Sequence, residues 1–315
     1  SRHQWVGHTV GFARPSAAML SVLGCAVMSD VFVGVDVGSV SVDVAVVEPS
    51  GRVLRAQYLR RKGHPMQQAA EALQAIVDEF GPGRVAGVAA TGNGGRVVAS
   101  LLGIPFVNEV VAQAAATARL HPQVRTVIEI GGEDSKLVIM KDVTAAGAGA
   151  DVPDAPGGVA DFAMNTMCAA GTGSFLDQQA TRLGLTIEDF GALAVTSETP
   201  PRVAGRCSVF AKSDMIHLQQ KATPVKDIVA GLCYALVRNF KSTVGSATRI
   251  QPPVSFQGGV AANAGIVKAL REVLELSETE LVIPEHFGCM GAIGAVYAAF
   301  PDSSEPACAP VNWSR

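Results

Sequence analysis

The chain of 315 residues has few aromatic side chains and little charge. Aromatic residues make up 5% and charged residues 17% of it, and the formal net charge is −3. Domains that bind nucleic acid usually carry a basic patch, so nucleic-acid binding is not expected. No run approaches the roughly 18 apolar residues that a membrane-spanning helix needs, and we therefore expect no membrane insertion.

Cysteine is too sparse for a fold held together by disulfides. The six cysteines are scattered over positions 25, 168, 207, 233, 289 and 308. With 48% hydrophobic residues, a chain this long can bury a sizeable core as one large domain or as two of about 150 residues. The pattern is typical of reduced cysteines, and it predicts a cytoplasmic location.

The first 30 residues form a separate segment. Residues 1–27 contain two arginines and no acid, and an apolar stretch runs over Ala17–Met28. Two interpretations remain open: a secretory signal, in which Val22–Cys25 mimics a lipoprotein cleavage site, or an upstream extension with Met28 as the natural start. A buried strand begins soon afterwards at Val31, which favours the extension.

Three glycine-containing turns, each after an apolar strand, are the main candidate ligand-binding elements; a further glycine-rich turn, Thr91–Arg96, either approaches a ligand or forms a tight strand–helix junction. The first turn contains Gly38 and Ser39, and Asp36 is the single charge of the strand before it. Gly38 allows the backbone to approach a phosphate, Ser39 offers a hydroxyl, and Asp36 can hold a metal-bound water. Alternatively, Asp36 serves only to form the turn, since aspartate favours turns.

The second turn repeats this design after a buried strand over Thr126–Ile130. It contains Gly131, Gly132 and Asp134 and leads into a returning strand that starts at Leu137. The repeat predicts two related halves that face one cleft, with their glycine turns on either side of a nucleotide's phosphates.

The third turn, Gly258–Gly259, lies between a strand and a helix start at Asn263. Two glycines permit close approach of a flat ring or a sugar, whereas Asn263 is also a natural helix cap.

The Ala- and Gly-rich stretch Lys141–Ala160 is typical of a flexible surface loop. Hydrophobic periodicity predicts helices over Pro65–Phe80, Glu109–Leu120, Thr186–Val195, Val225–Ala247 and Gly288–Phe300.

Two cysteines, Cys168 and Cys207, stand in matching contexts. Each precedes a stretch with helical periodicity, Ser174–Leu183 in the first case and the segment containing Val209, Phe210, Met215 and Ile216 in the second. A thiol at a helix N-terminus has a lowered pKa, which favours the thiolate as nucleophile or metal ligand. A lone cysteine is more often a small buried hydrophobe, and we interpret Cys233 and Cys289 in that way.

The order of the three turns resembles that of the acetate-kinase and actin type ATPases, over about Val31 to Phe300. Two further motifs, over Asn165–Leu176 and Arg206–Asp214, are more specific. They resemble the activator subunits of 2-hydroxyacyl-CoA dehydratases and the related ATPase subunits of benzoyl-CoA reductase, the BadF/BadG/BcrA/BcrD type.

This resemblance implies an α/β fold in which two ribonuclease-H-like subdomains surround an ATP cleft. The expected division is residues 31–125 with 288–300 for the first subdomain and residues 126–287 for the second, with an extension over 1–30 and a tail over 301–315.

The resemblance also implies roles for individual residues. Asp36 is expected at the Mg²⁺ position, with Glu129 and Asp134 as further catalytic acids. Glu129 and Glu133 stand where many members have aspartate and glutamine, so the residue that orients the hydrolytic water stays open, and Glu109 and Gln113 receive no role. The residues expected to bind ATP or ADP are Gly38, Ser39, Gly131, Gly132, Gly258, Gly259 and Asn263.

By the same resemblance, Cys168 and Cys207 from each of two copies hold one [4Fe–4S] cluster across a homodimer. A ferredoxin or flavodoxin reduces the cluster, and ATP hydrolysis drives a low-potential electron to a partner 2-hydroxyacyl-CoA dehydratase or benzoyl-CoA reductase. The sequence leaves open the partner's substrate, the electron donor, and pairing with a paralogue instead of a second copy.

Two other functions remain as alternatives. A small-molecule kinase of the same fold, such as a sugar kinase, would need a base near the acceptor hydroxyl but neither Cys168 nor Cys207. A non-catalytic module would use the cysteines for Zn²⁺ or for nothing. Two cysteines without a histidine pair make a poor zinc site within one chain, although a dimeric site of four cysteines stays possible.

Overall fold

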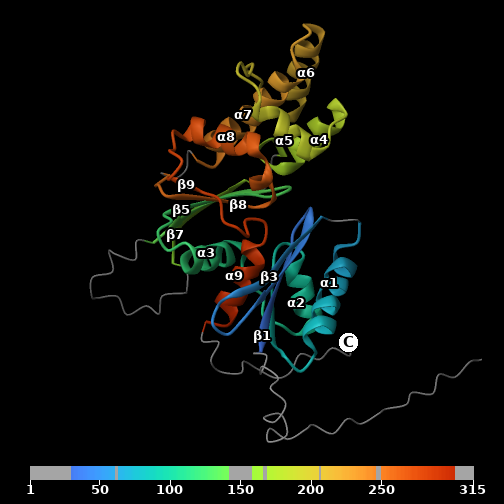
Figure 1. Cartoon of the computed structure of the whole chain (residues 1–315), viewed down its shortest axis with the longest axis vertical. Helices are drawn as coiled ribbons and strands as arrows, with labels where there is room; N and C mark the ends of the chain where they lie inside the picture. Colours follow the sequence, from blue (N-terminus) through green and yellow to red (C-terminus); the bar gives the residue numbers. More distant parts are fainter. Residues whose placement is uncertain are drawn as a thin grey trace, which may run out of the picture.

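The computed structural model of the chain (Figure 1) describes residues 30–60, 63–141, 158–165, 169–205, 207–245 and 250–301. The expected N-terminal extension before Asp30, the tail after Pro301 and most of the expected loop over Lys141–Ala160 lie outside the described residues. Cys168 also lies outside them.

The first sheet has the strand order β3-β2-β1-β4, in which β2 is antiparallel and β4 is parallel to β1. Strands β1 and β2 are buried on both faces, and valine fills most of their positions. Odd-numbered valines of β1 pack against α1 (Pro65–Phe80) and α2 (Gly95–Leu102), and Phe32 packs on the other face. The strands are β1 (Val31–Val37), β2 (Ser41–Val47), β3 (Val53–Arg60) and β4 (Val85–Thr91).

The second sheet repeats this arrangement, with the order β7-β6-β5-β8-β9. Again the hairpin partner β6 is antiparallel and the later strand β8 is parallel to the first strand of the sheet, β5. The repeated topology confirms the two related halves expected from the sequence. The strands are β5 (Thr126–Ile130), β6 (Ser135–Met140), β7 (Val159–Asn165), β8 (Val254–Gln257) and β9 (Leu281–Val282).

Two helices lie where the sheets meet. Helix α9 (Met290–Ala299) returns from the second sheet to pack on β1 and on α3 (Glu109–Leu120). Small residues permit this approach: a Cβ added to Gly34 would lie 1.8 Å from the carbonyl oxygen of Ala292. Helix α3 packs on both sheets, so the subdomain boundary at residue 125 stays a prediction.

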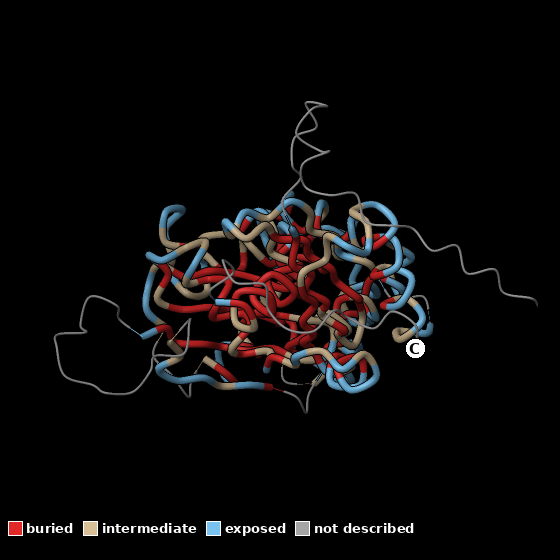
Figure 2. Tube along the Cα trace, turned by 90° about the horizontal axis from the view of Figure 1, so that it is seen from below, coloured by how far each residue is buried: buried red, intermediate tan, exposed pale blue. Residues whose placement is uncertain are grey.

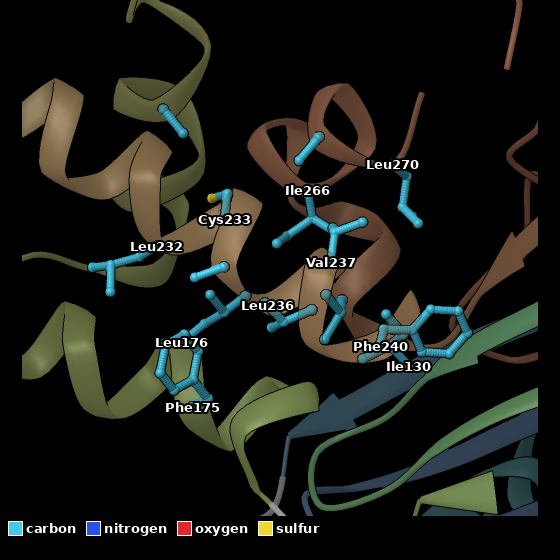
Figure 3. Packing of buried hydrophobic residues seen from close by; sticks show 14 of the residues in the cluster. Ile130, Phe175, Leu176, Leu232, Cys233, Leu236, Val237, Phe240, Ile266 and Leu270 are labelled. Atoms are coloured by element: carbon cyan, nitrogen blue, oxygen red, sulfur yellow. The ribbon is translucent and has the colours of Figure 1, made fainter. Parts of the chain in front are cut away.

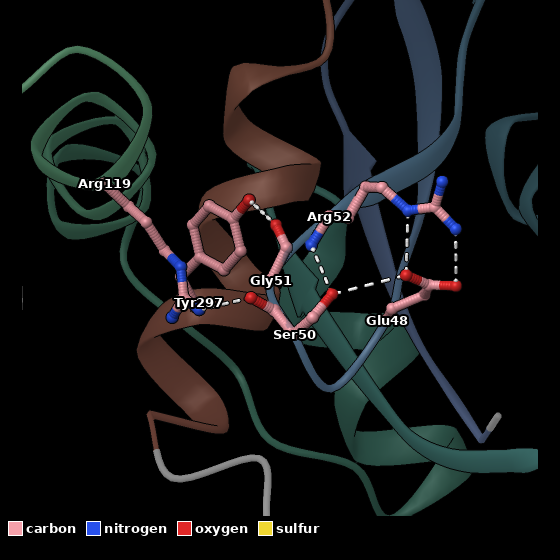
Figure 4. A network of polar contacts seen from close by, with 6 residues as sticks. All are labelled: Glu48, Ser50, Gly51, Arg52, Arg119 and Tyr297. Atoms are coloured by element: carbon pink, nitrogen blue, oxygen red, sulfur yellow. Dashed lines mark hydrogen bonds and ion pairs between the residues drawn. The ribbon is translucent and has the colours of Figure 1, made fainter.

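A polar network fastens α3 and α9 to the turn between β2 and β3 (Figure 4). The Tyr297 hydroxyl donates to the carbonyl oxygen of Gly51 at 2.7 Å. The Arg119 guanidinium lies over the Tyr297 ring, 4.8 Å from its centre, and donates to the carbonyl oxygen of Ser50. The turn itself is closed by the ion pair between Arg52 and Glu48.

Buried residues run through the middle of the molecule and exposed ones surround them (Figure 2).

One face of the second sheet carries the helices of the cysteine region (Figure 1). Helix α7 is the centre of this layer, and its apolar side packs against α4, α5, α8 and β5 (Figure 3). Cys233 of α7 is fully buried, which confirms it as a core residue. The helices are α4 (Gly173–Leu183), α5 (Ile187–Val195), α6 (Ser208–Gln220), α7 (Val225–Thr243) and α8 (Ala264–Leu274).

The structure corrects two expectations. Residues 159 and 160, assigned to a loop from their composition, begin β7, an exposed edge strand that lacks apolar alternation. Helix α4 runs over Gly173–Leu183 after the short 3-10 helix η2 (Ala169–Gly171), which confirms the helix expected over Ser174–Leu183. The helix after Cys207 is confirmed, but three of its apolar side chains are exposed: Val209, Phe210 and Ile216.

Candidate nucleotide site and cysteine region

The glycine turns of both sheets line one cavity of about 580 Å³. The turns after β5 and β8 lie side by side because these strands are parallel neighbours and their carboxyl ends lie at one edge of the second sheet. The turn after β1, from the first sheet, lines the same cavity. Asn263 lines the adjoining cavity instead. The predicted residues brought together in the first cavity are Asp36, Gly38, Ser39, Glu129, Gly131, Gly132, Asp134, Gly258 and Gly259.

Asp36 lies near the end of β1, and two glycines make room for its carboxylate. A Cβ on Gly92 would lie 2.3 Å from Asp36 Oδ1, and one on Gly291 would lie 2.1 Å from Oδ2. Burial, with a further contribution from the negative charge of Glu109, raises the pKa of Asp36 to about 7. The protein thus holds a carboxylate in a place where its charge is unfavourable until a cation arrives.

Lys136, on β6, is a functional residue that the sequence analysis missed. Its amine contacts three carboxylates: Glu129 at 2.7 Å, Asp134 at 2.9 Å and Glu109 at 2.9 Å. Burial alone would lower the pKa of Lys136, but the three negative charges outweigh it and raise the pKa above its ordinary value. A charged residue inside an apolar strand was the available signal, as it was for Asp36.

Of the three acids around Lys136, Glu129 is held where its negative charge is unfavourable. Burial raises the pKa of Glu129 to about 7 in spite of the neighbouring lysine. Glu109 begins α3 and lines the cavity, so the residue left without a role belongs to the site. Gln113, one turn further along α3, lines the cavity too.

Asp43 adds a fifth carboxyl group to the site. It is buried, accepts a hydrogen bond from the Ser41 hydroxyl at 3.0 Å, and its Oδ1 is without a hydrogen-bond partner. Burial and then the charge of Asp36 raise its pKa well above the ordinary value. The hydrophobic alternation of β2 concealed this residue from the sequence analysis.

The charge balance of the cavity indicates what it can accept. Lys136 is the single cation among the described residues that line it, against five carboxyl groups. A polyphosphate would be repelled there unless a divalent cation entered with it. Carboxylate oxygens are the ligands that Mg²⁺ prefers, and Mg²⁺ usually binds through one or two carboxylates plus phosphates and waters. The donor set therefore fits Mg²⁺ bound together with a nucleotide.

The second cavity, of about 1210 Å³, continues from the first through Tyr58 and Gly259. It is more apolar, and Leu176, Ile187 and Val260 are among its lining residues. Such a cavity suits the flat base and the sugar of a nucleotide.

Two polar features mark the second cavity. Asn263 caps α8 by accepting from the N–H of Ile266 at 3.1 Å, and its buried Nδ2 is without a partner. Arg60 of β3 and Asp177 of α4 form an ion pair of 2.7 Å that joins the two halves at the cavity.

Cys207 is the N-cap residue of α6 and is partly exposed. The backbone before it is held by two side chains: Asn239 Nδ2 donates to the carbonyl oxygen of Gly205 at 2.7 Å, and the N–H of Ala204 donates to Asp214 at 2.8 Å. A partly exposed thiol at a helix start is chemically suited to bind a metal. In Figure 1, α6 lies at the end of the molecule remote from the first sheet.

Comparison with known proteins agrees with this geometry. Residues 33–299 match the BadF/BadG/BcrA/BcrD ATPase family. The (R)-2-hydroxyglutaryl-CoA dehydratase activating ATPase of Acidaminococcus fermentans is 30% identical over 277 residues, which are 86% of this chain and 98% of that protein. The 2-hydroxyisocaproyl-CoA dehydratase activator of Clostridioides difficile is 33% identical over 201 residues, which are 63% of this chain and 68% of that protein.

Two solved structures are similar over most of the chain. The A. fermentans (R)-2-hydroxyglutaryl-CoA dehydratase component A has a TM-score of 0.76 at 27% identity and covers 88% of this chain and 100% of its own. The C. difficile activator of the 2-hydroxyisocaproyl-CoA dehydratase, with bound ADPNP, has a TM-score of 0.74 at 26% identity and covers 87% and 96%.

These comparisons confirm the expected fold class, and they do not favour a small-molecule kinase. Among the residues that the structure describes, no helix has the length and apolar character to cross a membrane. The chain is a member of the BadF/BadG/BcrA/BcrD ATPase family.

Proposed function

We propose that the protein uses ATP hydrolysis to drive low-potential electron transfer from a [4Fe–4S] cluster to a partner enzyme. The observation that carries this proposal is the combination, in one chain, of an acid-lined nucleotide cleft and a partly exposed thiol at the start of α6. The relatives named as dehydratase activators support the same function.

In the cleft, the nucleotide's phosphates lie between the turn containing Gly38 and Ser39 and the turn containing Gly131 and Gly132. Asp36 holds the Mg²⁺ through its carboxylate or through a bound water. Glu129 and Asp134 surround the γ-phosphate end, where both contact the amine of Lys136, and one of them orients the hydrolytic water.

The nucleoside occupies the second cavity. Gly258 and Gly259 bring the backbone close to it; a Cβ on Gly259 would lie 2.6 Å from the Tyr58 hydroxyl, so a larger residue would narrow the passage between the cavities. Asn263 offers its unpartnered Nδ2 to the sugar or the base. This arrangement accommodates ATP and ADP alike.

Cys168 and Cys207 of each chain would hold the cluster, which would serve as a one-electron carrier of low potential. A [4Fe–4S] cluster takes four thiolates, so a chain that contributes two cysteine ligands would require a second copy. The exposed apolar side chains Val209 and Phe210, two and three positions after Cys207, are suited to the contact between copies.

The partners follow from this role. A ferredoxin or flavodoxin reduces the cluster, and a 2-hydroxyacyl-CoA dehydratase or a benzoyl-CoA reductase type enzyme accepts the electron. The names of the relatives support this class of partner. The ATPase cycle biases the cysteine region between two arrangements and so makes the transfer directional.

The test is metal analysis under anaerobic conditions. We expect about four irons and four sulfides per dimer, with a broad visible absorption, in the wild type. Cys168→Ala and Cys207→Ala should lose both, whereas Cys233→Ala, which removes a buried core thiol, should keep both.

A colourless protein that stays iron-free after reconstitution, yet hydrolyses ATP, would contradict the electron-transfer function. Zinc in place of iron would support the alternative of a non-catalytic module with a dimeric zinc site of four cysteines. In either case the kinase alternative would regain interest, and transfer of phosphate to compounds with free hydroxyl groups would be measured.

A further inference from the structure

The turn after β5 and the start of α4 are hydrogen-bonded to each other. The N–H of Gly173 donates to the carbonyl oxygen of Gly131 at 2.8 Å, and the N–H of Ser174 donates to that of Gly132 at 2.8 Å. The Ser174 hydroxyl donates to the same Gly132 oxygen at 2.6 Å. The first N–H groups of a helix have no partner within the helix, so the turn satisfies the N-terminus of α4.

This contact leaves little room for the turn Gly131–Gly132 to move independently of the start of α4. A Cβ on Gly173 would lie 3.0 Å from the carbonyl oxygen of Gly131 and 3.1 Å from Val260 Cγ2. Phe175 and Leu176, the next residues of α4, are buried in the core under the second sheet (Figure 3). A displacement of the turn is therefore transmitted to the start of α4, because packed interiors shift between discrete arrangements and do not deform gradually.

The connection continues toward the cysteine. The N–H and the hydroxyl of Thr172 both donate to the carbonyl oxygen of Ala169, at 3.0 and 2.8 Å, and Thr172 is fully buried. Ala169 follows Cys168 in the chain. Two hydrogen-bonded pairs, Gly132 with Ser174 and Thr172 with Ala169, are thus joined by the covalent chain through Gly173 and connect the cavity wall to the residue next to Cys168.

We propose that Ser174 is a positioning residue that ties the segment 169–173 to the turn Gly131–Gly132, so that the nucleotide in the cleft sets the placement of that segment. The proposal rests on the proposed function in one respect, namely that the phosphates contact this turn. ATP and ADP can shift the segment only through contacts that differ between them, and a turn at the phosphates is where those contacts differ.

The test is amide hydrogen exchange on the cluster-free protein with ADP and with a non-hydrolysable ATP analogue, each with Mg²⁺. In the wild type, we expect exchange over 169–183 to differ by about tenfold between the two nucleotides, a usual size for coupling between sites. In Ser174→Ala the difference should fall below about threefold, while the peptide containing Gly131 and Gly132 keeps its response.

Two further variants separate positioning from folding. Ser174→Thr keeps a hydroxyl and should restore the nucleotide-dependent difference. Thr172→Val keeps the shape of the side chain and the N–H bond to Ala169 but removes the hydroxyl bond, so it should weaken the response of 169–171 and spare that of 173–183. Exchange in β1 and β4 is the internal control and should match the wild type in every variant.

Two results would overturn the proposal. One is a wild-type response at Gly131 and Gly132 that does not extend to 169–183. The other is a response over 169–183 that Ser174→Ala leaves unchanged. Because the measurement uses protein without a cluster, a failure to find iron would refute the electron-transfer function and leave this result unaffected.

Discussion

The turn after β1 and the turn after β5 have the same place in their sheets but different surroundings. Asp36, at the first turn, forms no ion pair with another described residue, and its pKa is raised to about 7 by burial. At the second turn, Glu129 and Asp134 share the amine of Lys136. The second turn alone is also bonded to α4. This difference indicates that the first turn awaits a cation, whereas the acids of the second turn already share a lysine and that turn is connected to the cysteine region.

The largest expected effect comes from unbalancing the second turn. Lys136→Met leaves Glu129, Asp134 and Glu109 without a counter-charge, and removal of one member of a buried ion pair usually costs about 3–5 kcal/mol of folding free energy. Denaturant unfolding at about pH 8 should show this loss. The loss should shrink at about pH 5, below the raised pKa of Glu129, where that acid binds a proton. An unchanged denaturant midpoint in Lys136→Met would contradict the claim that Lys136 offsets the charges of the neighbouring acids.

Neutralising Asp36, the acid of the first turn, should increase the stability of the nucleotide-free protein, whereas Lys136→Met should reduce it. The folded-state pKa of Asp36 is about 7 against an ordinary 3.8, so the unfavourable charge develops as the pH rises from about 4 to about 7 and stays constant above that range. Asp36→Asn removes it and should stabilise the nucleotide-free protein by about 2 kcal/mol at about pH 8 and by less at about pH 5.

Thermal unfolding with and without Mg-ATP tests whether the carboxylate of Asp36 is needed for the cation. The wild type should be stabilised by the nucleotide, and Asp36→Asn should respond weakly because the cation has lost its carboxylate. If Asp36→Asn were less stable than the wild type at high pH, the first turn would not be a site awaiting a cation.

A matched pair of glycine substitutions compares the two turns sterically. A Cβ on Gly132 would lie 2.0 Å from Val40 Cγ2, across the cleft, whereas a Cβ on Gly38 would meet its nearest atom at an ordinary 3.5 Å. Gly132→Ala should therefore destabilise the protein by about 1–3 kcal/mol, and Gly38→Ala by less than about 0.5 kcal/mol. Equal effects in thermal unfolding would show that the turns are equally open.

The smallest expected effect concerns the ion pair that joins the halves. Arg60 and Asp177 are both partly exposed, so Arg60→Gln should reduce stability by no more than about 1 kcal/mol. The difference from the wild type should diminish at high salt, since exposed pairs are screened. A loss well above this size, or one insensitive to salt, would mean that the two halves depend on this contact much more than its exposure suggests.

The sequence was sufficient where a local pattern decides the structure. Apolar strands followed by glycine turns predicted that Asp36, Gly131 and Gly258 lie near one ligand site, and all three line one cavity. The pattern is informative because a glycine turn at the end of a buried strand lets the backbone approach a ligand. The periodicity of Pro65–Phe80 gave the bounds of α1 as they are found.

The remainder depends on contacts between distant segments. Glu109 and Lys136 are 27 positions apart, and their ion pair exists because α3 packs beside β6, which no local pattern reports. The strand β7 was missed because its residues are exposed and do not alternate. The apolar side chains of α6 predicted the helix correctly, yet Val209 and Phe210 are exposed, since nothing in the described chain covers them.

The central claim is that the nucleotide in the cleft controls a cluster held by Cys168 and Cys207. The most direct measurement is the rate at which a chelator removes iron from the anaerobically purified protein, with Mg-ADP and with Mg-ATP. The account predicts rates that differ by about tenfold or more, with the difference abolished in Asp36→Asn. Equal rates with both nucleotides in a protein that binds iron and hydrolyses ATP would contradict it.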